Sequence, residues 1–436
     1  MTRPTLTSIY SYGILAIFIG IVLHAPLTVA FGSLLPEIAE PIKGWKEMLM
    51  VMLAAIAIIL VTRHKLWPNL LADKAIWAAL AYVDLHLLLA LLMPGDLPAV
   101  VAGLMIDLRF IAFFVLAYIL TLLHPEARGA IVRSVAVGAA VVLGFGMLQI
   151  TVLPDDILRG IGYSGETIRP FTTIDQNTDY VRINSTLRGP NPLGAVCVLY
   201  GALALAYLVR RWHNLGTKRR WLVGASFATS VAILFASYSR SAYVAFTVMT
   251  ALVAAMTLRK TLSIRVVAAG LAAVLVGVAG LAALQSSDWY SNVILHENPD
   301  STITSKSNQE HTDSLIDGLK RAERQPFGAG VGSTGSASMY DRDPTNNVII
   351  ENWYLFVAHE SGWIGLALFL ALISIIFVRL WQRRTDWLAV GLLASGIGLA
   401  LIGLLLPVWA DDTVALVWWG LAGAILGGDY AERTRQ

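Results

Sequence analysis

Residues 10–32 read YSYGILAIFIGIVLHAPLTVAFG, a run without a single Asp, Glu, Lys or Arg. A helix of this length crosses the roughly 30 Å hydrocarbon core of a bilayer. Eleven further apolar blocks follow, and none shows the two-residue alternation of an outer-membrane barrel. Apolar residues make up 56% of the chain and charged residues 14%, with a mean hydropathy of +0.66. The sequence therefore predicts an all-α polytopic membrane protein of about twelve transmembrane helices, with residues 1–436 forming a single membrane domain.

The twelve blocks define the expected topology. The predicted spans are 10–32, 47–62, 76–93, 103–123, 132–153, 191–209, 221–237, 241–258, 264–284, 352–378, 387–408 and 412–428. Two of them are less regular than the rest. The fourth contains Asp107 and Arg109, and the last is short and ends in Gly427 and Gly428. Losing either span would change the predicted topology.

Basic residues predict the orientation. With a cytoplasmic N-terminus, every connection on the inner side is basic, and these connections hold 19 of the 32 Lys and Arg residues. We therefore expect a multi-pass protein of the bacterial inner (cytoplasmic) membrane with both termini in the cytoplasm. The first span has no small-residue cleavage site and is expected to remain as a signal anchor. The net charge of +3 gives no indication of a nucleic-acid partner.

Two long loops fall on the periplasmic side of this topology, at 154–190 and 285–351, and they hold most of the polar residues. The first is rich in Asp, Thr, Asn, Gly and Pro, which predicts an ordered loop with turns. In the second, Leu315, Ile316 and Leu319 follow helical spacing with charged residues opposite them. This pattern predicts a short amphipathic helix on the membrane surface. Function is expected between these loops and the bundle.

Two arginines at helix ends predict an anion site. Arg240 lies in SYSRSAY, in a very short connection between two spans; an arginine there either binds an anion or extends to the interface. Arg188 precedes the sixth span, where Asn191 is the expected N-cap and Pro192 falls in the first turn. The N–H groups of that helix end, with Arg188 and Arg240, suit a phosphate or pyrophosphate. Arg182 is a weaker candidate because it fits an exposed loop charge.

A glycine-rich run, FGAGVGSTG, contains Gly328, Gly330 and Gly332. It resembles a phosphate loop, but the Lys-Ser/Thr ending and a preceding strand are missing. The simpler interpretation is a turn that allows the backbone to approach a neighbour closely. A backbone nest for a lipid-linked phosphate is the alternative.

The sequence offers three candidates for a general base. Glu351 stands where the second long loop re-enters the membrane and acts either as a base or as a capping group. His359 follows eight residues later, so the two fall on one face if both lie in one helix. His311, in the loop, is the third candidate. No HExxH motif or Cys/His cluster occurs, so neither a metal nor a cofactor is expected, and the lone Cys197 is expected to be an apolar filler.

Four segments in order resemble the O-antigen ligase and O-antigen polymerase family of bacterial membrane glycosyltransferases. They are RINSTLRGPNPLG, SYSRSAYVAF, HTDSLIDGLKRAERQPFGAGVGS and ENWYLFVAHESGWIGL, within residues 182–365. The resemblance implies a GT-C-like fold and glycan transfer from an undecaprenyl-diphosphate-linked oligosaccharide donor at the periplasmic face. It also implies inversion without a metal. Arg188 and Arg240, together with Arg182, would bind the donor diphosphate.

The resemblance leaves the acceptor open. Ligases of the family typically carry His-Asn at the re-entry point, whereas this chain has Glu351-Asn352. That difference favours a polymerase, whose acceptor is a sugar on a second lipid-linked oligosaccharide. The alternatives are a ligase to lipid A-core and a protein oligosaccharyltransferase. The predicted substrate loop comprises Asn191, Asn352, Gly328, Gly330 and Gly332.

A flippase or transporter is the alternative from another class, because twelve spans with internal termini also suit a transporter. Transporters show repeat symmetry and polar residues at mid-membrane. Here the polar exceptions are Asp84, His86, Asp107 and Arg109, which we expect to pair with one another or to line a glycan cavity. The expected partners are the lipid-linked donor, the glycan acceptor, membrane lipids and a chain-length regulator.

Overall fold

The computed structural model describes residues 5–174, 177–258 and 304–435. The α-helices are α1 Leu6–Gly20, α2 His24–Leu34, α3 Ala39–Lys43, α4 Trp45–Arg63, α5 Trp67–Ala72, α6 Lys74–Leu92, α7 Leu97–Leu123, α8 Ala127–Thr151, α9 Pro190–Arg211, α10 Thr217–Ser237, α11 Arg240–Leu258, α13 Thr304–Arg324, α14 Gly335–Ser338, α15 Trp353–Gln382, α16 Trp387–Ile402 and α17 Asp412–Arg435. Short 3-10 turns are η1 Ile21–Leu23, η2 Pro36–Ile38, η3 Ile157–Ile161, η4 Trp212–Asn214, η6 Pro344–Asn346 and η7 Val408–Ala410. The strands are β1 Thr172–Ile174 and β2 Asn177–Arg182.

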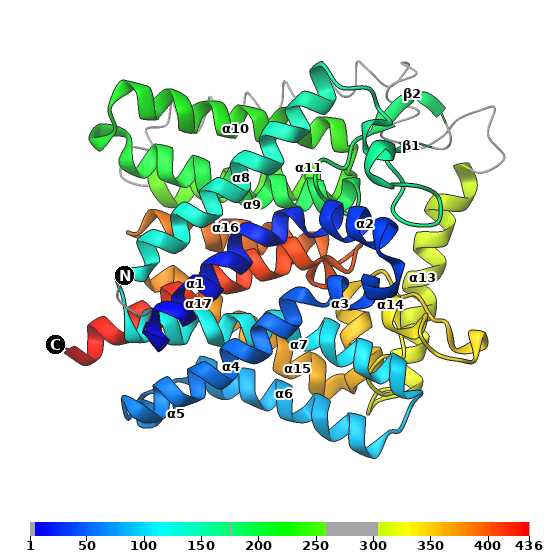
Figure 1. Ribbon diagram of the computed structural model, residues 1–436, viewed down its shortest axis with the longest axis horizontal. Helices are drawn as coiled ribbons and strands as arrows, with labels where there is room; N and C mark the ends of the chain where they lie inside the picture. Colours follow the sequence, from blue (N-terminus) through cyan, green and yellow to red (C-terminus); the bar gives the residue numbers. More distant parts are fainter. Residues whose placement is uncertain (1–4, 175–176, 259–303, 436) are drawn as a thin grey trace.

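The long helices lie roughly side by side along one axis (Figure 1). Helix α1 begins and α17 ends at one end of this bundle, which we call the terminal end. The strands, α13 and α14 lie at the opposite end, which we call the loop end (Figure 1). The predicted all-α polytopic membrane fold is confirmed.

Within the described residues, ten helices are long and apolar enough to cross a bilayer. The first runs from Leu6 to Leu34 through α1, η1 and α2. The predicted span at 264–284 lies outside the described residues. The span predicted at 387–408 is wrong in length, because α16 ends at Ile402 after 16 residues.

The backbone that follows α16 forms hydrogen bonds with the start of α15 and does not continue the helix. Gly403 O accepts from Trp353 N at 2.8 Å, and Leu404 O accepts from Asn352 Nδ2 at 2.8 Å. Irregular backbone is tolerated at membrane depth where it is buried against protein partners. The segment after α16 therefore holds the start of α15 in place.

The two irregular spans of the sequence, α7 and α17, form the centre of the bundle. Helix α17 presents Gly423 and Gly427 to α7, where a Cβ would collide with the carbonyl oxygens of Phe114 and Tyr118. Small residues allow helix backbones to approach closely inside a membrane, where van der Waals packing drives association. Gly427, one of the two glycines that made the last span look weak, is thus one of the residues that allow α17 to pack there.

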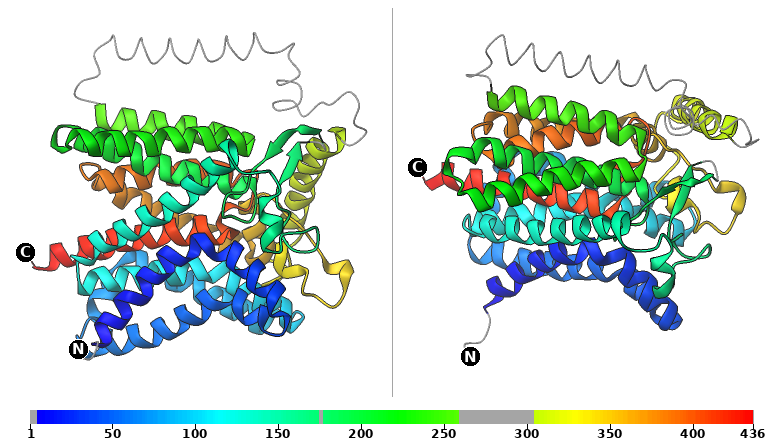
Figure 2. Two further views of the ribbon diagram at one scale, coloured as in Figure 1. Left: turned by 45° about the horizontal axis from the view of Figure 1, so that its top comes forward. Right: turned by 90° about the horizontal axis from the view of Figure 1, so that it is seen from above.

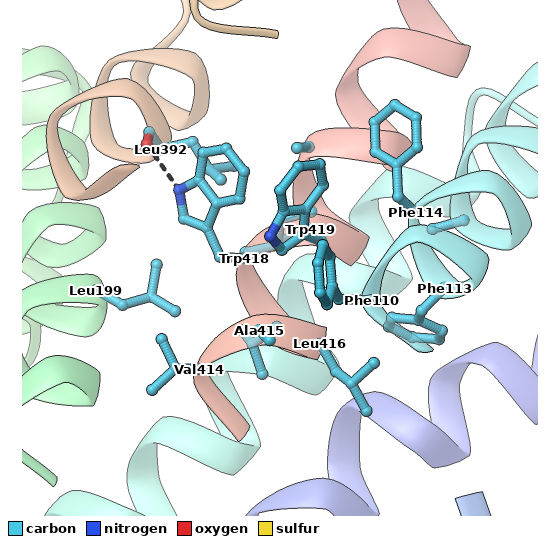
Figure 3. Close-up of a cluster of buried hydrophobic side chains, with 14 of the residues drawn as sticks. Phe110, Phe113, Phe114, Leu199, Leu392, Val414, Ala415, Leu416, Trp418 and Trp419 are labelled. Carbon is cyan, nitrogen blue, oxygen red and sulfur yellow. Dashed lines mark hydrogen bonds between the residues drawn. The ribbon is translucent and has the colours of Figure 1, made fainter. Parts of the chain in front are cut away.

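Aromatic side chains fill the space around this contact (Figure 3). The rings of Phe110 and Trp419 lie 5.0 Å apart, and Trp418 and Trp419 lie 5.3 Å apart in an edge-on arrangement. Trp418 also donates from Nε1 to Leu392 O of α16 at 3.0 Å (Figure 3). This cluster joins α7, α16 and α17 into one core.

The first long loop contains a small hairpin that the sequence did not predict. Strand β1 pairs antiparallel with β2, with Thr172 opposite Arg182. The predicted order in this loop is therefore present, and β2 leads the chain toward the start of α9.

The amphipathic helix predicted in the second loop is present as α13. It lies across the loop end, transverse to the long helices (Figures 1 and 2). Leu315, Ile316 and Leu319 are 43–47% exposed, whereas Ala322 is buried. Its placement on a membrane surface remains a prediction. Residues 285–303 of this loop lie outside the described residues.

Candidate active site

A cavity of about 640 Å³ opens at the loop end between α2, α4, α7 and the segment before β1. We call it the basic cavity. Its charged and titratable lining residues are His24, Lys43, Lys46, Glu47, Arg109, Glu166, Arg188, Tyr340 and Asp412. An apolar wall is formed by Val29, Val101, Ala102, Met105 and Ile106. A concave site that joins an apolar wall to a few polar groups is typical of ligand-binding cavities.

Asp412 organises the floor of the basic cavity. Its carboxylate lies 3.1 Å from His24 Nε2 and 3.1 Å from Lys46 Nζ, and it forms an ion pair with Arg109. Glu47 accepts from Lys46 at 3.0 Å and lies 3.7 Å from Arg109. Apart from Glu47, these side chains are at least nine-tenths buried. Two cations therefore face two carboxylates, and the floor has no net charge when His24 is neutral.

Arg188 lies at the rim of the same cavity. Within the part of the chain that the structure describes, its guanidinium has no ion-pair or hydrogen-bond partner. Burial raises the pKa of the neighbouring Asp411, and the charges of Arg188 and Arg109 partly oppose that rise. Arg188 is thus a cation close to the floor whose donors are available to a ligand.

The start of α9 differs from the sequence prediction. The cap residue is Gly189 and the helix begins at Pro190, so the assignment of Asn191 as N-cap is wrong. Pro190 and Pro192 lack an N–H, and Leu193 N donates to Gly189 O at 3.2 Å. Among the first four residues of α9, only the amide of Asn191 remains for a ligand. The helix end therefore contributes less to an anion site than the sequence suggested.

Arg182 and Arg240 do not line the basic cavity. Arg182 donates to Ser237 O at 2.9 Å and to Asn191 Oδ1 at 2.7 Å, which ties β2 to the end of α10 and the start of α9. Arg240 is half-buried at the first position of α11. Of the three residues predicted to bind diphosphate, the structure places Arg188 in this cavity.

A second cavity of about 380 Å³, which we call the histidine cavity, lies beside the glycine-rich loop. Its titratable lining residues are Asp96, Arg321, Asp341 and His359. His359 is buried, and its Nδ1 has no hydrogen-bond partner among the described residues. An imidazole with an unused ring nitrogen in a polar cavity can transfer a proton. The backbone of His311 lies in α13, but its side chain lies outside the described part of the chain.

The glycine-rich loop adopts the left-handed backbone conformation that favours glycine. Gly328, Gly330 and Gly332 have φ of +92°, +100° and +80°. The amides of Gly332 and Thr334 donate to Glu360 Oε1 at 3.1 and 3.2 Å. These two N–H groups are therefore used by a carboxylate of the protein, and contact of the loop with substrate remains a prediction.

Asn352 is the N-cap of α15. Its Oδ1 accepts from two amides of the first turn, at 2.9 and 3.0 Å, and its Nδ2 donates to Leu404 O. Glu351 precedes this cap and is half-buried. It lines neither of the two cavities. The expectation that Glu351 and His359 share a helix face is wrong, because α15 begins at Trp353.

The polar residues predicted within spans do not pair with one another among the described residues. Arg109 pairs with Asp412 and lines the basic cavity. Asp107 instead lies against the carboxyl group of Glu360. His86 Nδ1 lies 2.8 Å from a carbonyl of its own helix. Asp84 is exposed on the surface of the bundle.

Sequence analysis did not single out His24, Lys46, Glu47 or Asp412. Their positions along the spans could have indicated them, because successive spans cross the membrane in opposite directions. Lys46 and Glu47 begin α4 and Asp412 begins α17, while His24 lies late in the first span. Because successive spans alternate in direction, all four fall toward the loop end. Their partners become evident only when these helices are adjacent.

A sequence model of the O-antigen ligase family matches residues 225–370. The matched segment contains Arg240, α13, the glycine-rich loop, and Glu351 and His359. Residues 225–370 therefore resemble an O-antigen ligase domain. The predicted resemblance to the O-antigen ligase and polymerase family is thus confirmed. No curated protein matches the chain.

The domain accounts for part of each cavity. Tyr340 in the basic cavity and His359 in the histidine cavity belong to the matched segment. Arg188 and the charged floor lie outside it. The basic cavity is therefore lined by residues inside the matched segment and by residues before and after it.

Proposed function

We propose that this chain is a surface-polysaccharide polymerase. It transfers a glycan from an undecaprenyl-diphosphate-linked donor to the terminal sugar of a second lipid-linked oligosaccharide. Its O-antigen ligase domain supports a membrane glycosyltransferase of this type. In this proposal the loop end faces the periplasm and the terminal end faces the cytoplasm of a bacterium, in the inner membrane.

The observation that carries the proposal is the unpartnered Arg188 above a charge-balanced floor. Because Asp412 and Glu47 already neutralise Lys46 and Arg109, a bound diphosphate would draw its compensation first from Arg188. The apolar wall beside this charge suits the polyprenyl chain of the same ligand. One cavity thus accommodates both parts of a lipid-linked donor.

The chemistry is a single displacement at the anomeric carbon. The acceptor hydroxyl oxygen forms the new glycosidic bond while the bond from carbon to diphosphate oxygen breaks. The electron pair leaves with the diphosphate, whose growing negative charge Arg188 would stabilise. The hydroxyl proton passes to a base, for which Glu351, His359 and His311 are the candidates. Arg240 and Arg182 would support the donor from the adjoining turn.

Glu351→Gln is expected to slow transfer by about 100-fold, the lower end of what a positioned base contributes. Donor affinity should change much less, because the amide keeps the size of the carboxyl group. Rates measured at saturating and limiting donor separate these two effects. Glu323→Gln, on the exposed side of α13, is the matched control. An unchanged rate in Glu351→Gln would leave this residue with a structural role before α15.

The ligase is the second candidate function, and the description of the matched family favours it. The acceptor would then be lipid A-core, and a protein acceptor defines the oligosaccharyltransferase variant. Both use the donor and the cavity in the same way as a polymerase and differ from it in the acceptor.

The glycan profile of a deletion strain distinguishes these functions. Loss of a polymerase should leave core carrying a single repeat unit. Loss of a ligase should instead accumulate long lipid-linked polymer. A flippase, the alternative from another class, would leave unpolymerised lipid-linked repeats on the cytoplasmic leaflet. Electrophoresis of lipopolysaccharide together with extraction of lipid-linked glycans provides all three readouts.

A further inference from the structure

Two carboxyl groups outside both cavities meet in the core of the bundle. Glu360 on α15 is 1% exposed and Asp107 on α7 is 2% exposed, and the two carboxyl groups lie against each other. Within the described residues, no N–H or O–H group donates to either oxygen of Asp107 or to Oε2 of Glu360. Two adjacent carboxylates without a cation cannot both ionise in such surroundings. The contact is therefore stable only when the pair carries a proton.

The other side of Glu360 binds the glycine-rich loop. Its Oε1 accepts from Gly332 N and Thr334 N, and its main-chain oxygen accepts from Gly330 N at 3.1 Å. The preceding carbonyl, of His359, accepts from the amide of residue 329 at 2.6 Å. Four loop amides thus end on two consecutive residues of α15.

Steric contacts leave the loop little freedom. A Cβ on Gly332 would collide with Ala99 O of α7, and a Cβ on Gly103 would lie 2.5 Å from Gly332 N. On the other side, a Cβ on Gly362 would lie 2.5 Å from Pro326 O, where α15 is interrupted with φ of +67°. The loop is wedged between α7 and α15, and the Asp107–Glu360 pair joins the same two helices.

We propose that Glu360 is a positioning residue, and that the proton it shares with Asp107 holds the glycine-rich loop between the two cavities. Residues 330–333 of this loop line the histidine cavity, and Ser336 and Tyr340 line the basic cavity. Displacement of the loop would alter both walls at once. The effect on transfer rests on the proposed function, whereas the placement of the loop does not.

The proposal implies that the loop loosens at alkaline pH. Removing the shared proton leaves two negative charges in contact, and their repulsion separates α7 from the loop. The titratable groups around the pair include Tyr82 on α6, His86, whose ring lies 4.2 Å from that of Tyr82, and His359, which precedes Glu360 on α15. None of these supplies a fixed positive charge to compensate for the lost proton.

Cysteine labelling tests the placement of the loop without reference to glycan transfer. Val331 lies on the loop and is 3% exposed, and the native Cys197 is fully buried. In the full chain carrying Val331→Cys, maleimide labelling should be slow. Adding Glu360→Ala should raise the rate by at least about tenfold, the change expected when hydrogen bonds to a buried carboxyl are lost. Glu360→Gln should restore the slow rate, because its amide accepts from the loop and donates to Asp107.

The pH dependence tests the shared proton. The labelling rate of the Val331→Cys protein is divided, at each pH, by the rate of the same protein with Glu360→Gln added. This ratio cancels the pH dependence of the reactivity of the thiol itself. This ratio should rise with pH, and a ratio that stays flat would overturn the shared proton. Labelling of Glu360→Ala at the parental rate would overturn the proposal as a whole. If Glu360→Ala does not accumulate in the membrane, the pH dependence of the ratio with Glu360→Gln tests the proposal on its own.

Glycan transfer supplies the second readout. The kcat should fall in Glu360→Ala and recover in Glu360→Gln, with activity retained to higher pH in the latter. Unchanged transfer in a Glu360→Ala protein that labels rapidly would overturn the positioning role. If the labelling rates are as expected in a protein that transfers no glycan at all, the positioning of the loop by Glu360 is supported and only the proposed function is contradicted.

Discussion

Arg188→Ala is expected to lower the rate of glycan transfer by about 1,000-fold, with unchanged abundance in the membrane. Among the residues described, Arg188 is the cation of the basic cavity rim without a partner. A departing diphosphate gains negative charge in the transition state, and the floor cannot replace Arg188 because its cations are already paired with Asp412 and Glu47. Transfer between purified lipid-linked substrates in liposomes measures the effect.

Three comparisons make this result specific. Arg159→Ala removes a charge from the same loop whose side chain is 65% exposed, and it should leave transfer unchanged. Arg188→Lys should give an intermediate rate, because an ammonium keeps the charge but loses bidentate geometry. Full activity in Arg188→Ala would remove the argument for this cavity. If Arg240→Ala alone abolished transfer, the diphosphate site would move to the turn between α10 and α11.

Asp412→Ala is expected to destabilise the protein by about 3–5 kcal/mol, the cost of leaving buried cations unpaired. Its carboxylate lies against His24, Lys46 and Arg109, and its side chain is 3% exposed. With alanine, Glu47 would face two cations alone. The loss should appear as a lower unfolding temperature in detergent and a lower yield from membranes.

A double variant tests whether charge balance is the cause. Combining Asp412→Leu with Arg109→Leu removes one charge of each sign and leaves Lys46 paired with Glu47, so much of the lost stability should return. Arg342→Ala is the control, because its side chain is 84% exposed and its 3.7 Å pair with Asp96 should contribute at most about 1 kcal/mol. Wild-type stability in Asp412→Ala would contradict the assigned role of the floor.

The membrane fold could be predicted from the sequence because its main signal is local. A span such as Leu6–Leu34 or Trp353–Gln382 needs only its own residues to be recognised, since each helix satisfies its own backbone hydrogen bonds. The predictions failed where neighbours decide the backbone. Helix α16 ends at Ile402 because the next carbonyls bond to the start of α15. The cap of α9 moved from Asn191 to Gly189.

The candidate site was only partly predictable for the same reason. Arg188, His359 and the glycine-rich loop stand in segments whose composition marks them as unusual. The partners of Arg109 could not be identified in this way, because Glu47 comes from α4 and Asp412 from α17. Sequence spacing carries no information on which of the many spans are adjacent.

The sequence by itself therefore determined that this protein is a bundle of membrane helices with a segment that resembles the O-antigen ligase family, because hydrophobic length and short motifs are properties of continuous segments. Only the tertiary structure decided that Arg188 lines a cavity with a charge-balanced floor and that Glu360 lies against Asp107 while it binds the glycine-rich loop. Buried charges in a membrane are stable only with partners, and those partners come from helices that are distant in the chain. The candidate site therefore forms where charged residues from different helices of the bundle pair with one another.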